Sequence, residues 1–436
     1  MHDNKNNSMT SIRKLRLAYI IGTHPTLSTT FIDREIKTLR ELGVSIQILS
    51  IRRPGPHAAL TEKYSQMKES IIYLLPVDWI KFMAAHLYFI LFRPIAYFTL
   101  LLFLFTRPHR SLKLRLKTLL HFAEGVYAAY LLQNLDWDHI HAHFLDRAAT
   151  VALCVSRLLR VSYSLAAHAV DIYVQPVLIP EKIGEAKFTV TDSEFNRVYL
   201  LKHYPELNPD KIFAHHPWID LSQFCLTGTR TDHPLLRIMS VGRLVEKKGH
   251  HYLIEACHLL QKEGVDFECR ILGDGPLKSE LEEMITRYNL TQQVYLLGGQ
   301  PQEEVLAQLS QSDVFVLACV VAKNGDRDGM PVSLAEAMAM EIPVISTDLV
   351  GIGEMIRPGA GYLVPPEDPA ALAEAIKAMN LIGPSKRIEM GKYGRTIIAQ
   401  DFELFKGIHR LADLFLEAIA EKNVKTSSVV QAKPMS

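Results

Sequence analysis

Short apolar runs alternate with amphipathic stretches along the first half of the chain. The run at residues 15–21 (LRLAYII) is followed by an amphipathic stretch at 31–43 and by a second apolar run at 45–51. An apolar strand, an amphipathic helix and a further apolar strand in this order indicate a βαβ unit with parallel strands. The same order recurs around HIHAHF, YSLAAHA, KFTVTDS and KIFAHHP, so we predict an α/β domain over residues 15–225.

The alternation restarts after a polar stretch at 226–235, which we interpret as a linker. Apolar runs such as LRIMSVG, FECRILG and VFVLAC alternate with helix-like segments over residues 236–400. The predicted fold class is therefore α/β, with two facing Rossmann-like, doubly wound parallel-sheet domains and a cleft between them. Ligands of open α/β sheets bind at the carboxyl ends of the strands, so we expect the site there.

The ends of the chain fall outside this alternation. We expect residues 401–421 to form a helix that packs back towards the N-terminal domain, and residues 1–14 and 422–436 to be disordered. Neither half carries GxGxxG after its first strand, so the standard dinucleotide-binding fingerprint is absent.

The segment 79–122 departs from the pattern because apolar residues dominate it as far as Thr106 and a basic stretch follows. Its longest uncharged run, Pro94 to Thr106, is shorter than the roughly 20 residues that a membrane-spanning helix needs, and Arg93-Pro94 divides the segment. An apolar hairpin with a basic flank fits a segment lying in the interface of an anionic membrane. The alternative is a pair of buried helices packed on the N-terminal domain. The basic flank consists of Arg107, His109, Arg110, Lys113, Arg115 and Lys117.

Composition narrows the class of protein. A chain of 436 residues is too long for one ordinary domain, and its net charge of +1 gives no electrostatic reason to expect nucleic acid as a partner. The five cysteines show no CxxC spacing, which favours free thiols in a reducing compartment. With a polar N-terminus and no signal-peptide pattern, we expect a cytoplasmic protein, peripheral on the inner face of the plasma membrane.

Candidate chemistry begins at SVGRLVEKKG, where the first strand of the C-terminal domain ends. Gly242 allows a tight turn, and Arg243 and Lys248 can both point back over the strand end. Two cations beside a helix start are suited to holding a diphosphate. The alternative is that both are solvated surface cations.

The stretch NGDRDGMPVSLAEAMAM contains two overlapping acidic patterns. Asp326 and Asp328 form an Asp-x-Asp pair that could bind a divalent metal ion. Alternatively, Asp328 and Glu336 flank the start of a helix after Pro331, where the free amides of residues 332–334 would attract a phosphate. A third possibility is that neither residue binds a ligand: Asp328 then only complements the helix dipole, and Glu336 is an ordinary helix residue.

Several motifs in a fixed order resemble the retaining glycosyltransferases of family 4, which have the GT-B fold. They are the GRxxxxKG turn, ILGDGP, the acidic-x7-Glu helix and GYLVPPEDP in the second half, and PTLSTTFIDREI, HAHF, AAHAVDIY and VTDSEFNRVYL in the first. The resemblance covers roughly residues 15–420 and is strongest to the bacterial exopolysaccharide, colanic-acid-type transferases.

On the donor side the resemblance implies specific roles. Arg243 and Lys248 match the cations that hold the donor diphosphate, and Glu336 matches the glutamate expected on the ribose hydroxyls. Asp328 stands where the family has a glutamate that contacts the donor sugar, and its side chain is one methylene shorter. The neighbours expected to face the donor are Gly242, Gly329, Met330, Pro331 and Val332.

On the acceptor side the resemblance points to a histidine of the N-terminal domain. His168 matches the family's histidine at the reaction centre, so His168 and Asp328 are our catalytic candidates. We assign His24 and Asp171 to the acceptor side or the cleft, and His141 and His143 to packing.

The predicted activity is transfer of a sugar, with retention, from a nucleotide-diphosphate sugar to a saccharide acceptor that is lipid-linked at the membrane. We expect no cofactor and no metal ion, because the cations already neutralise the diphosphate. Two alternatives stay open: a GT-B enzyme of another class, such as a nucleotide-sugar epimerase or a phosphorylase, and a non-catalytic scaffold that binds sugar nucleotides.

Overall fold

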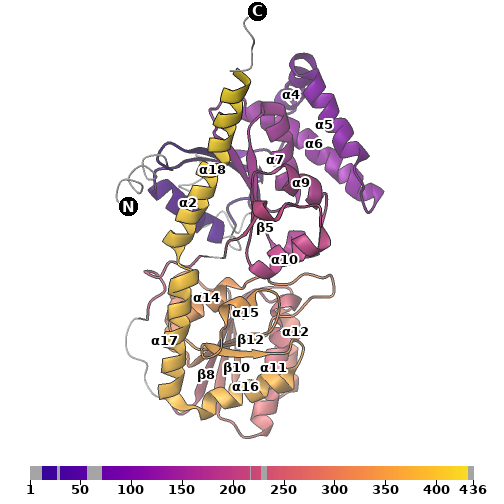
Figure 1. Ribbon diagram of the computed structural model, residues 1–436. Helices are drawn as coiled ribbons and strands as arrows, with labels where there is room; N and C mark the ends of the chain where they lie inside the picture. Colours follow the sequence, from indigo (N-terminus) through magenta and orange to yellow (C-terminus); the bar gives the residue numbers. More distant parts are fainter. Residues whose placement is uncertain (1–11, 27–29, 56–70, 217, 227–232, 431–436) are drawn as a thin grey trace, which may run out of the picture. The chain divides into compact units, whose positions relative to one another are not determined.

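The computed structural model describes residues 12–26, 30–55, 71–216, 218–226 and 233–430 of the chain. These residues form two compact units, which are described separately below (Figure 1). Unit 1 contains the residues up to Thr191, Arg197–Ala214 and the residues from Ile408 onwards. Unit 2 contains Asp192–Asn196 and His215–Gly407.

Unit 1 is built on a parallel sheet that, among the described residues, has seven strands in the order β3-β2-β1-β4-β5-β6-β7. The strand prediction for the first half is confirmed, with the addition of β3, which the apolar pattern does not reveal. The strands are β1 (Arg16–Thr23), β2 (Ser45–Arg52), β3 (Ile71–Tyr73), β4 (His139–His143), β5 (Tyr163–Ala167), β6 (Thr189–Thr191) and β7 (Ile212–Ala214).

The helices of unit 1 connect these strands. They are α2 (Thr30–Glu41), α4 (Trp79–Phe92), α5 (Pro94–Thr106), α6 (Leu112–Leu132), α7 (Arg147–Leu159), α8 (Ala169–Tyr173), α9 (Ile179–Glu185) and α10 (Glu194–His203), whose first residues belong to unit 2. Helix α6 packs so closely on α7 that a Cβ at Gly125 would lie only 2.4 Å from the Cβ of Cys154. That contact joins the apolar segment at 79–122 to the core of the unit.

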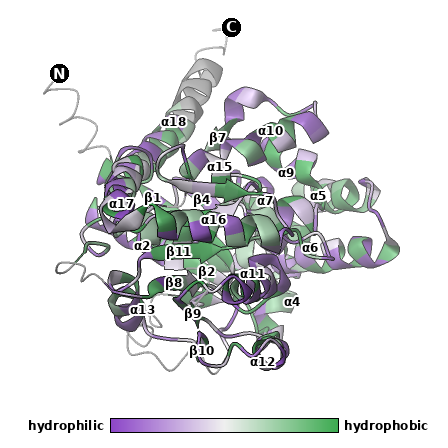
Figure 2. Ribbon diagram, turned by 90° about the horizontal axis from the view of Figure 1, so that it is seen from below, coloured by the Kyte–Doolittle hydropathy of each residue, from purple (hydrophilic) through white to green (hydrophobic). Residues whose placement is uncertain are grey.

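Helices α4, α5 and α6 present apolar side chains to both sides. Their inner sides, with Phe89, Leu100 and Val126, are part of the core of unit 1. Their outer sides are just as apolar, and Ile80 and Ile95 are 83% and 80% exposed. The hydropathy colouring of these helices can be followed in Figure 2. The remaining exposed apolar residues here are Trp79, Met83, Leu87, Leu91, Phe92, Phe98, Leu102, Phe105, Leu112, Leu116 and Leu120.

This arrangement bears on both interpretations of residues 79–122, as a segment at a membrane surface and as buried helices. The helices pack on unit 1, but the interpretation as fully buried helices is wrong for their outer side. No single helix of the described residues meets the length and hydropathy expected of a membrane span, although α4 and α5, bent by 110° at their junction, do so as a pair. The break falls at Arg93-Pro94, as the sequence predicts.

Unit 2 has a second parallel sheet, of six strands among its described residues, in the order β10-β9-β8-β11-β12-β13. The strands are β8 (Leu236–Val241), β9 (Phe267–Leu272), β10 (Val294–Gly298), β11 (Val314–Leu317), β12 (Val344–Thr347) and β13 (Gly361–Val364). The connecting helices are α11 (His250–Lys262), α12 (Lys278–Arg287), α13 (Gln302–Ser310), α14 (Val332–Ala339), α15 (Ile352–Met355), α16 (Pro369–Leu381) and α17 (Gly383–Asp401), and a 3₁₀ turn, η4 (Glu246–Lys248), precedes α11.

Side chains along β11 show that helices cover both faces of this sheet. Val314 and Val316 belong to the core formed with α11, α12 and α16, whereas Phe315 and Leu317 belong to the core formed with α14 and α17. Successive strand residues point to opposite faces, so a strand apolar at every position is buried on both. The doubly wound parallel sheets predicted from the sequence are confirmed.

Helix α18 (Leu404–Val430) carries the chain from unit 2 into unit 1, where Phe415 lies against the rings of His139 and His141. Residues 422–430 of the tail that we expected to be disordered are helical, and residues 431–436 lie outside the described part. Most of the expected N-terminal tail and linker, 1–11 and 227–232, also lies outside it.

Candidate active site

The two sequence stretches with candidate chemistry in unit 2 follow neighbouring strands. Strands β8 and β11 are paired in parallel, so their carboxyl ends lie side by side. A Cβ at Gly249, where φ is +63°, would lie 1.7 Å from the carbonyl oxygen of Ala318. Glycine therefore allows the turn after β8 to touch the backbone at the end of β11.

Four charged side chains meet at this edge, and we call them the lysine–aspartate cluster: Lys247, Lys248, Asp326 and Asp328. The Lys248 Nζ atom lies 2.7 Å from the Asp328 Oδ2 atom. The Lys247 Nζ atom lies between the two carboxylates, 3.1 Å from Asp326 Oδ1 and 3.3 Å from Asp328 Oδ1. The structure therefore brings together Lys248 and Asp328, which the sequence singles out, and adds Lys247, which it does not.

The charges of the cluster stabilise one another. Burial opposes the charged form of Asp328, but Lys248 and Lys247 outweigh it and hold the pKa of the carboxyl below its ordinary value. Burial likewise opposes the charged form of Lys248, and Asp328 more than compensates, so the pKa of the ammonium group is raised. Lys248 and Asp328 thus hold each other in the charged form at neutral pH.

The metal hypothesis for Asp326 and Asp328 can be compared with this geometry. Both carboxylates are directed at lysine ammonium groups, which already supply positive charge at the positions a cation would take. Such a donor set does not fit a divalent ion unless the lysines move away. Our prediction of no metal at this site stays a prediction.

The loop after Asp328 leads into α14 as the sequence predicts. Pro331 is the N-cap residue, and no described side chain caps the helix. The Leu334 N–H donates to the Pro331 carbonyl oxygen at 3.1 Å, so among the first-turn amides those of Val332 and Ser333 are the candidates for a ligand. The Ser333 Oγ atom is buried there without a hydrogen-bond partner among the described residues. Met330 and Pro331 are buried, while Val332 and Glu336 are half-buried, with Glu336 in the second turn.

The turn after β8 places the other donor-side candidates. The Gly242 N–H donates to the Leu272 carbonyl, and a Cβ at Gly242 would lie 3.2 Å from the Lys248 side chain. Arg243 is exposed and forms no ion pair with any described residue. Gly329 faces Asp192, whose carboxylate lies 2.4 Å from the position of a Cβ. Asp192, whose pKa is raised to about 6 by burial, is not among the site residues predicted from the sequence.

In unit 1, His168 and Asp171 lie at the carboxyl end of β5. His168 is the N-cap residue of α8, and its ring lies 4.5 Å from that of Phe144 between centroids. The buried Asp171 carboxylate accepts hydrogen bonds from the backbone N–H groups of Leu145, at 2.8 Å, and His168, at 3.2 Å. Burial raises the pKa of Asp171 well above its ordinary value. Asp171 thus ties together the loops that follow β4 and β5.

His24 lies deeper in unit 1 than the sequence suggests. Its side chain is 1% exposed, and its Nε2 atom lies 3.6 Å from the Asp33 carboxylate. Burial, together with His143 and Arg40, lowers the pKa of His24 to about 4, so its ring is neutral at physiological pH. His141 and His143 are also buried, and His143 lies 3.2 Å from the Glu35 carboxylate, which agrees with the packing role expected for them.

A pocket of about 420 Å³ opens at the carboxyl ends of β1, β2 and β4 in unit 1. Among its lining residues, Lys117 and Asp171 are singled out by the sequence, whereas Arg52 and Arg147 stand in no recognisable motif and were not predicted. The other lining residues are Gly22, Thr23, Thr26, Phe144, Asp146, Val170 and Gln175.

Two doubly wound parallel-sheet units in one chain, with cations and an uncapped helix start at the strand ends of the second, define the GT-B class of nucleotide-sugar-dependent enzymes. The sequence profile described as "Glycosyl transferases group 1" matches residues 230–397. The chain is also 34% identical to a glycosyltransferase of which it covers 69%, so it belongs to this family, the retaining group 1 or family 4 glycosyltransferases.

Relatives and solved structures agree with this assignment. The chain is 34% identical over 284 residues to the putative colanic acid biosynthesis glycosyltransferase WcaL of Salmonella typhimurium, covering 63% of this chain and 69% of that protein. It is 36% identical over 212 residues to the amylovoran biosynthesis glycosyltransferase AmsK of Erwinia amylovora, covering 48% and 52%.

Among solved structures, a glycosyltransferase from Rickettsia africae superposes with a TM-score of 0.69 at 16% identity, covering 93% of this chain and 99% of that chain. Anabaena HepE in complex with UDP-glucose superposes with a TM-score of 0.66 at 15% identity, covering 93% and 100%. At these identities the likeness concerns the fold, and it confirms the GT-B architecture predicted from the sequence.

Proposed function

We propose that this chain transfers a sugar, with retention, from a nucleotide-diphosphate sugar to a lipid-linked saccharide during exopolysaccharide synthesis. The observation that carries the donor side is the meeting of Lys248, Asp328 and the uncapped start of α14 at one strand edge. The names of the WcaL and AmsK relatives support the exopolysaccharide context, and the UDP-glucose complex of HepE supports a nucleotide-diphosphate sugar as donor.

The donor diphosphate is bound by Arg243, Lys248 and the amides at the start of α14. As the bond between the sugar carbon and the phosphate oxygen breaks, negative charge grows on the leaving diphosphate. Cations and helix amides fixed at that position stabilise the charge without rearranging. The acceptor hydroxyl oxygen forms the new bond to the sugar, and the leaving phosphate takes the acceptor proton.

Two carboxylates orient the donor. Glu336, half-buried in the second turn of α14, binds the ribose hydroxyls. Asp328 keeps the Lys248 ammonium in place by its 2.7 Å ion pair and contacts the donor sugar when the diphosphate engages the lysine. Gly242, Gly329 and the backbone from Met330 to Val332 provide close approach to the sugar and phosphate.

Unit 1 supplies the acceptor side. His168, on the N-cap of α8, is the residue proposed to contact the reacting sugar. Asp171 acts as a positioning residue, because its carboxylate is occupied by the backbone N–H groups of Leu145 and His168. His24 is likewise assigned to positioning, since it is buried and neutral.

The outer sides of α4, α5 and α6 dock on the membrane that holds the acceptor. Contiguous exposed apolar side chains on a folded unit mark an interaction surface. Exposed basic residues stand between α5 and α6, where Arg107 stacks over Phe103 at 4.4 Å, and they suit the headgroups of anionic lipids. Lipids are therefore the partner we assign to this surface, on the inner face of the plasma membrane.

Turnover of a panel of nucleotide-sugars by the purified full-length chain tests the proposal. Release of nucleoside diphosphate is measured for the unaltered protein, for Glu336→Ala and for Glu389→Ala, an exposed control on α17. One donor should be turned over, and Glu336→Ala should raise its KM or abolish turnover while Glu389→Ala changes neither. Equal turnover by Glu336→Ala and the unaltered protein would favour a scaffold over an enzyme.

A further inference from the structure

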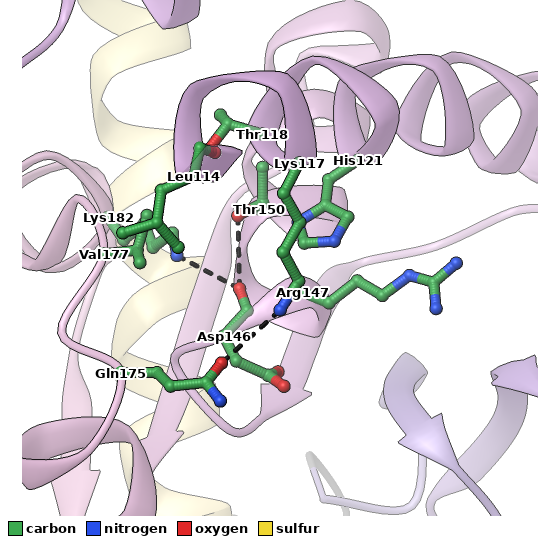
Figure 3. Close-up of a pocket in the computed structure, with 10 residues that line it drawn as sticks. All are labelled: Leu114, Lys117, Thr118, His121, Asp146, Arg147, Thr150, Gln175, Val177 and Lys182. Carbon is green, nitrogen blue, oxygen red and sulfur yellow. Dashed lines mark hydrogen bonds between the residues drawn. The ribbon is translucent and has the colours of Figure 1, made fainter. Parts of the chain in front are cut away.

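The pocket in unit 1 has the charge of an anion site. We call it the basic pocket and define it by Arg52, Lys117 and Arg147 at its wall, with Asp146 and Gln175 beside them. A second, small cavity of about 20 Å³ shares Lys117, Asp146, Arg147 and Gln175 with it (Figure 3).

Two of the cations are held without a carboxylate partner. The Lys117 Nζ atom donates to the Gln175 side-chain oxygen at 3.4 Å, and within the described parts of the chain neither Lys117 nor Arg52 forms an ion pair. Arg147, by contrast, donates to the Glu124 carboxylate, with its Nε atom at 2.6 Å. A cation that faces a pocket without a partner is available to a ligand.

The acidic groups nearby offset this charge only in part. Asp146 caps α7, its carboxylate accepting the Ala148 N–H at 3.2 Å, so it serves the helix start. Burial raises the pKa of Asp171 well above its ordinary value, which favours the neutral acid. Lys182 is buried nearby and donates to the carbonyl oxygens of Leu145, at 2.6 Å, and Asp146, at 3.0 Å. The positive end of the α7 dipole points the same way.

The positive charges around the pocket also affect the pKa of His121. This histidine lines the small cavity on α6, and burial lowers its pKa to about 3, assisted in order by Arg147, Lys182, Lys117 and Arg52. A neutral imidazole at this position adds no further positive charge but leaves ring nitrogens for hydrogen bonding.

Helix α6 joins this pocket to the apolar surface of α4–α6. Lys117 and His121 lie on its pocket side, and Leu112, Leu116 and Leu120 are exposed on its outer side. Residues three and four apart share one face of a helix, so these two sets form two separate rows. A ligand with an anionic head and a hydrocarbon tail would match both rows of the same helix.

We propose that the basic pocket binds the phosphate or diphosphate group that joins the acceptor saccharide to its lipid. The inference rests on the proposed function, since it assumes a lipid-linked acceptor. Arg52 and Lys117 bind the phosphate oxygens, and Gln175 and the backbone at the start of α7 complete the site. The lipid leaves the pocket towards the outer side of α4–α6, and the saccharide is held beside the strand ends of unit 1.

The test compares two double variants that remove equal charge. Arg52→Ala with Lys117→Ala removes the pocket cations, and Arg53→Ala with Lys202→Ala removes two exposed cations of unit 1 that line neither cavity. Binding is measured on phosphatidylcholine vesicles with and without a minor fraction of polyprenyl diphosphate. The pocket variant loses two charge-assisted hydrogen bonds to the phosphate, so it should lose at least about 10-fold in diphosphate-dependent binding. The control pair should lose little, and Lys117→Arg should retain binding.

Equal losses in both double variants would assign the effect to general surface charge and overturn the proposal. Unchanged binding by the pocket variant, with an unaltered thermal unfolding midpoint, would overturn it as well. Inorganic pyrophosphate distinguishes the source: if it binds the unaltered protein as tightly as the lipid vesicles do, the pocket takes free phosphate and the lipid assignment is wrong. Donor hydrolysis by the unaltered protein without acceptor reports on the proposed function alone, so the two failures are separable.

Discussion

The lysine–aspartate cluster of unit 2 and the basic pocket of unit 1 both place cations at the carboxyl ends of parallel strands, but they treat the charge differently. In the cluster, Lys247 and Lys248 are within 3.3 Å of carboxylate oxygens. In the pocket, Lys117 has only an amide oxygen, at 3.4 Å, among the described residues. One site is neutralised from within, and the other is left positive.

The difference indicates how each site would gain affinity for a phosphate group. A neutralised cluster fixes its ammonium groups in advance, and an incoming diphosphate must share Lys248 with Asp328, so the site depends on geometry as well as on charge. An unneutralised pocket attracts any phosphate and depends more strongly on ionic strength. We therefore expect single substitutions in the cluster to have larger effects than single substitutions in the pocket.

The largest effect should follow removal of the lysine that faces Asp328. Lys248→Ala leaves the leaving diphosphate without its fixed cation, and loss of one such group typically costs about 10²–10³-fold in turnover. Lys262→Ala, an exposed lysine in the last turn of α11, is the matched control and should retain full turnover. The measurement is kcat for release of nucleoside diphosphate. A loss of less than about threefold in Lys248→Ala would show that this lysine has no part in the mechanism.

A smaller effect, on stability, should follow removal of the aspartate. Asp328→Ala leaves Lys247 and Lys248, whose side chains are only 12% and 13% exposed, without an essential partner. Breaking a buried ion pair from one side costs roughly 3–5 kcal/mol of unfolding free energy, and Asp326 compensates part of this at Lys247. Urea unfolding should therefore show a loss of about 3 kcal/mol, against little change for the exposed Asp348→Ala. Equal stability of the two variants would mean that the lysines rearrange into solvent.

Much of this comparison could be predicted from the sequence, because the pattern is local in the chain. Apolar runs in β8 and β11, Gly242 at a turn and Pro331 at a helix start all follow from the properties of neighbouring residues. The parallel arrangement then places both strand ends at one edge. The pairing of Lys248 with Asp328 depends on residues 80 positions apart, so it required the register of the two strands.

Other features lay outside any local pattern. Arg52 and Arg147 follow ordinary strand and loop residues, and only the order β2-β1-β4 brings them to one pocket. The apolar segment at 79–122 predicted a pair of helices where the structure has α4, α5 and the start of α6. Its composition could not tell an inner from an outer side, since both sides of α4–α6 are apolar. The third helix also runs on to Leu132, where small residues such as Gly125 allow close packing on α7.

The apolar surface offers a third test, of moderate size. Phe98→Ser with Leu102→Ser removes two exposed side chains from the outer side of α5. Burying such a side chain in lipid contributes roughly 1.5–3 kcal/mol, so partitioning onto anionic vesicles should fall at least about 10-fold. Leu381→Ser, on the exposed end of α16 in unit 2, is the control and should partition as the unaltered protein does. Equal partitioning of all three proteins in vesicle sedimentation would exclude α5 from the membrane contact.

The smallest effect expected is on acid stability, and it again contrasts the two units. Burial holds the pKa of His250 in unit 2 at about 4, and the same cause holds the pKa of His24 in unit 1 at about 4. An unfolded histidine has a pKa near 6.5, so below that pH the unfolded chain takes up protons that the folded chain does not. Stability is therefore complete above pH 6.5 and falls progressively down to about pH 4.

Replacing His250 or His24 with glutamine should reduce the loss of unfolding free energy as the pH is lowered. Each unit of pKa difference corresponds to about 1.4 kcal/mol, so between pH 6.5 and 5.5 each buried histidine contributes a loss of about 1 kcal/mol. The variant His250→Gln should lose this part of the slope in urea unfolding, and His233→Gln, which alters an exposed histidine of unit 2, should keep it. An unchanged slope in His250→Gln would mean that the ring is protonated in the folded chain despite Lys248 beside it. Retention of the slope in His24→Gln as well would place the acid-sensitive groups elsewhere than in these two strand-end sites.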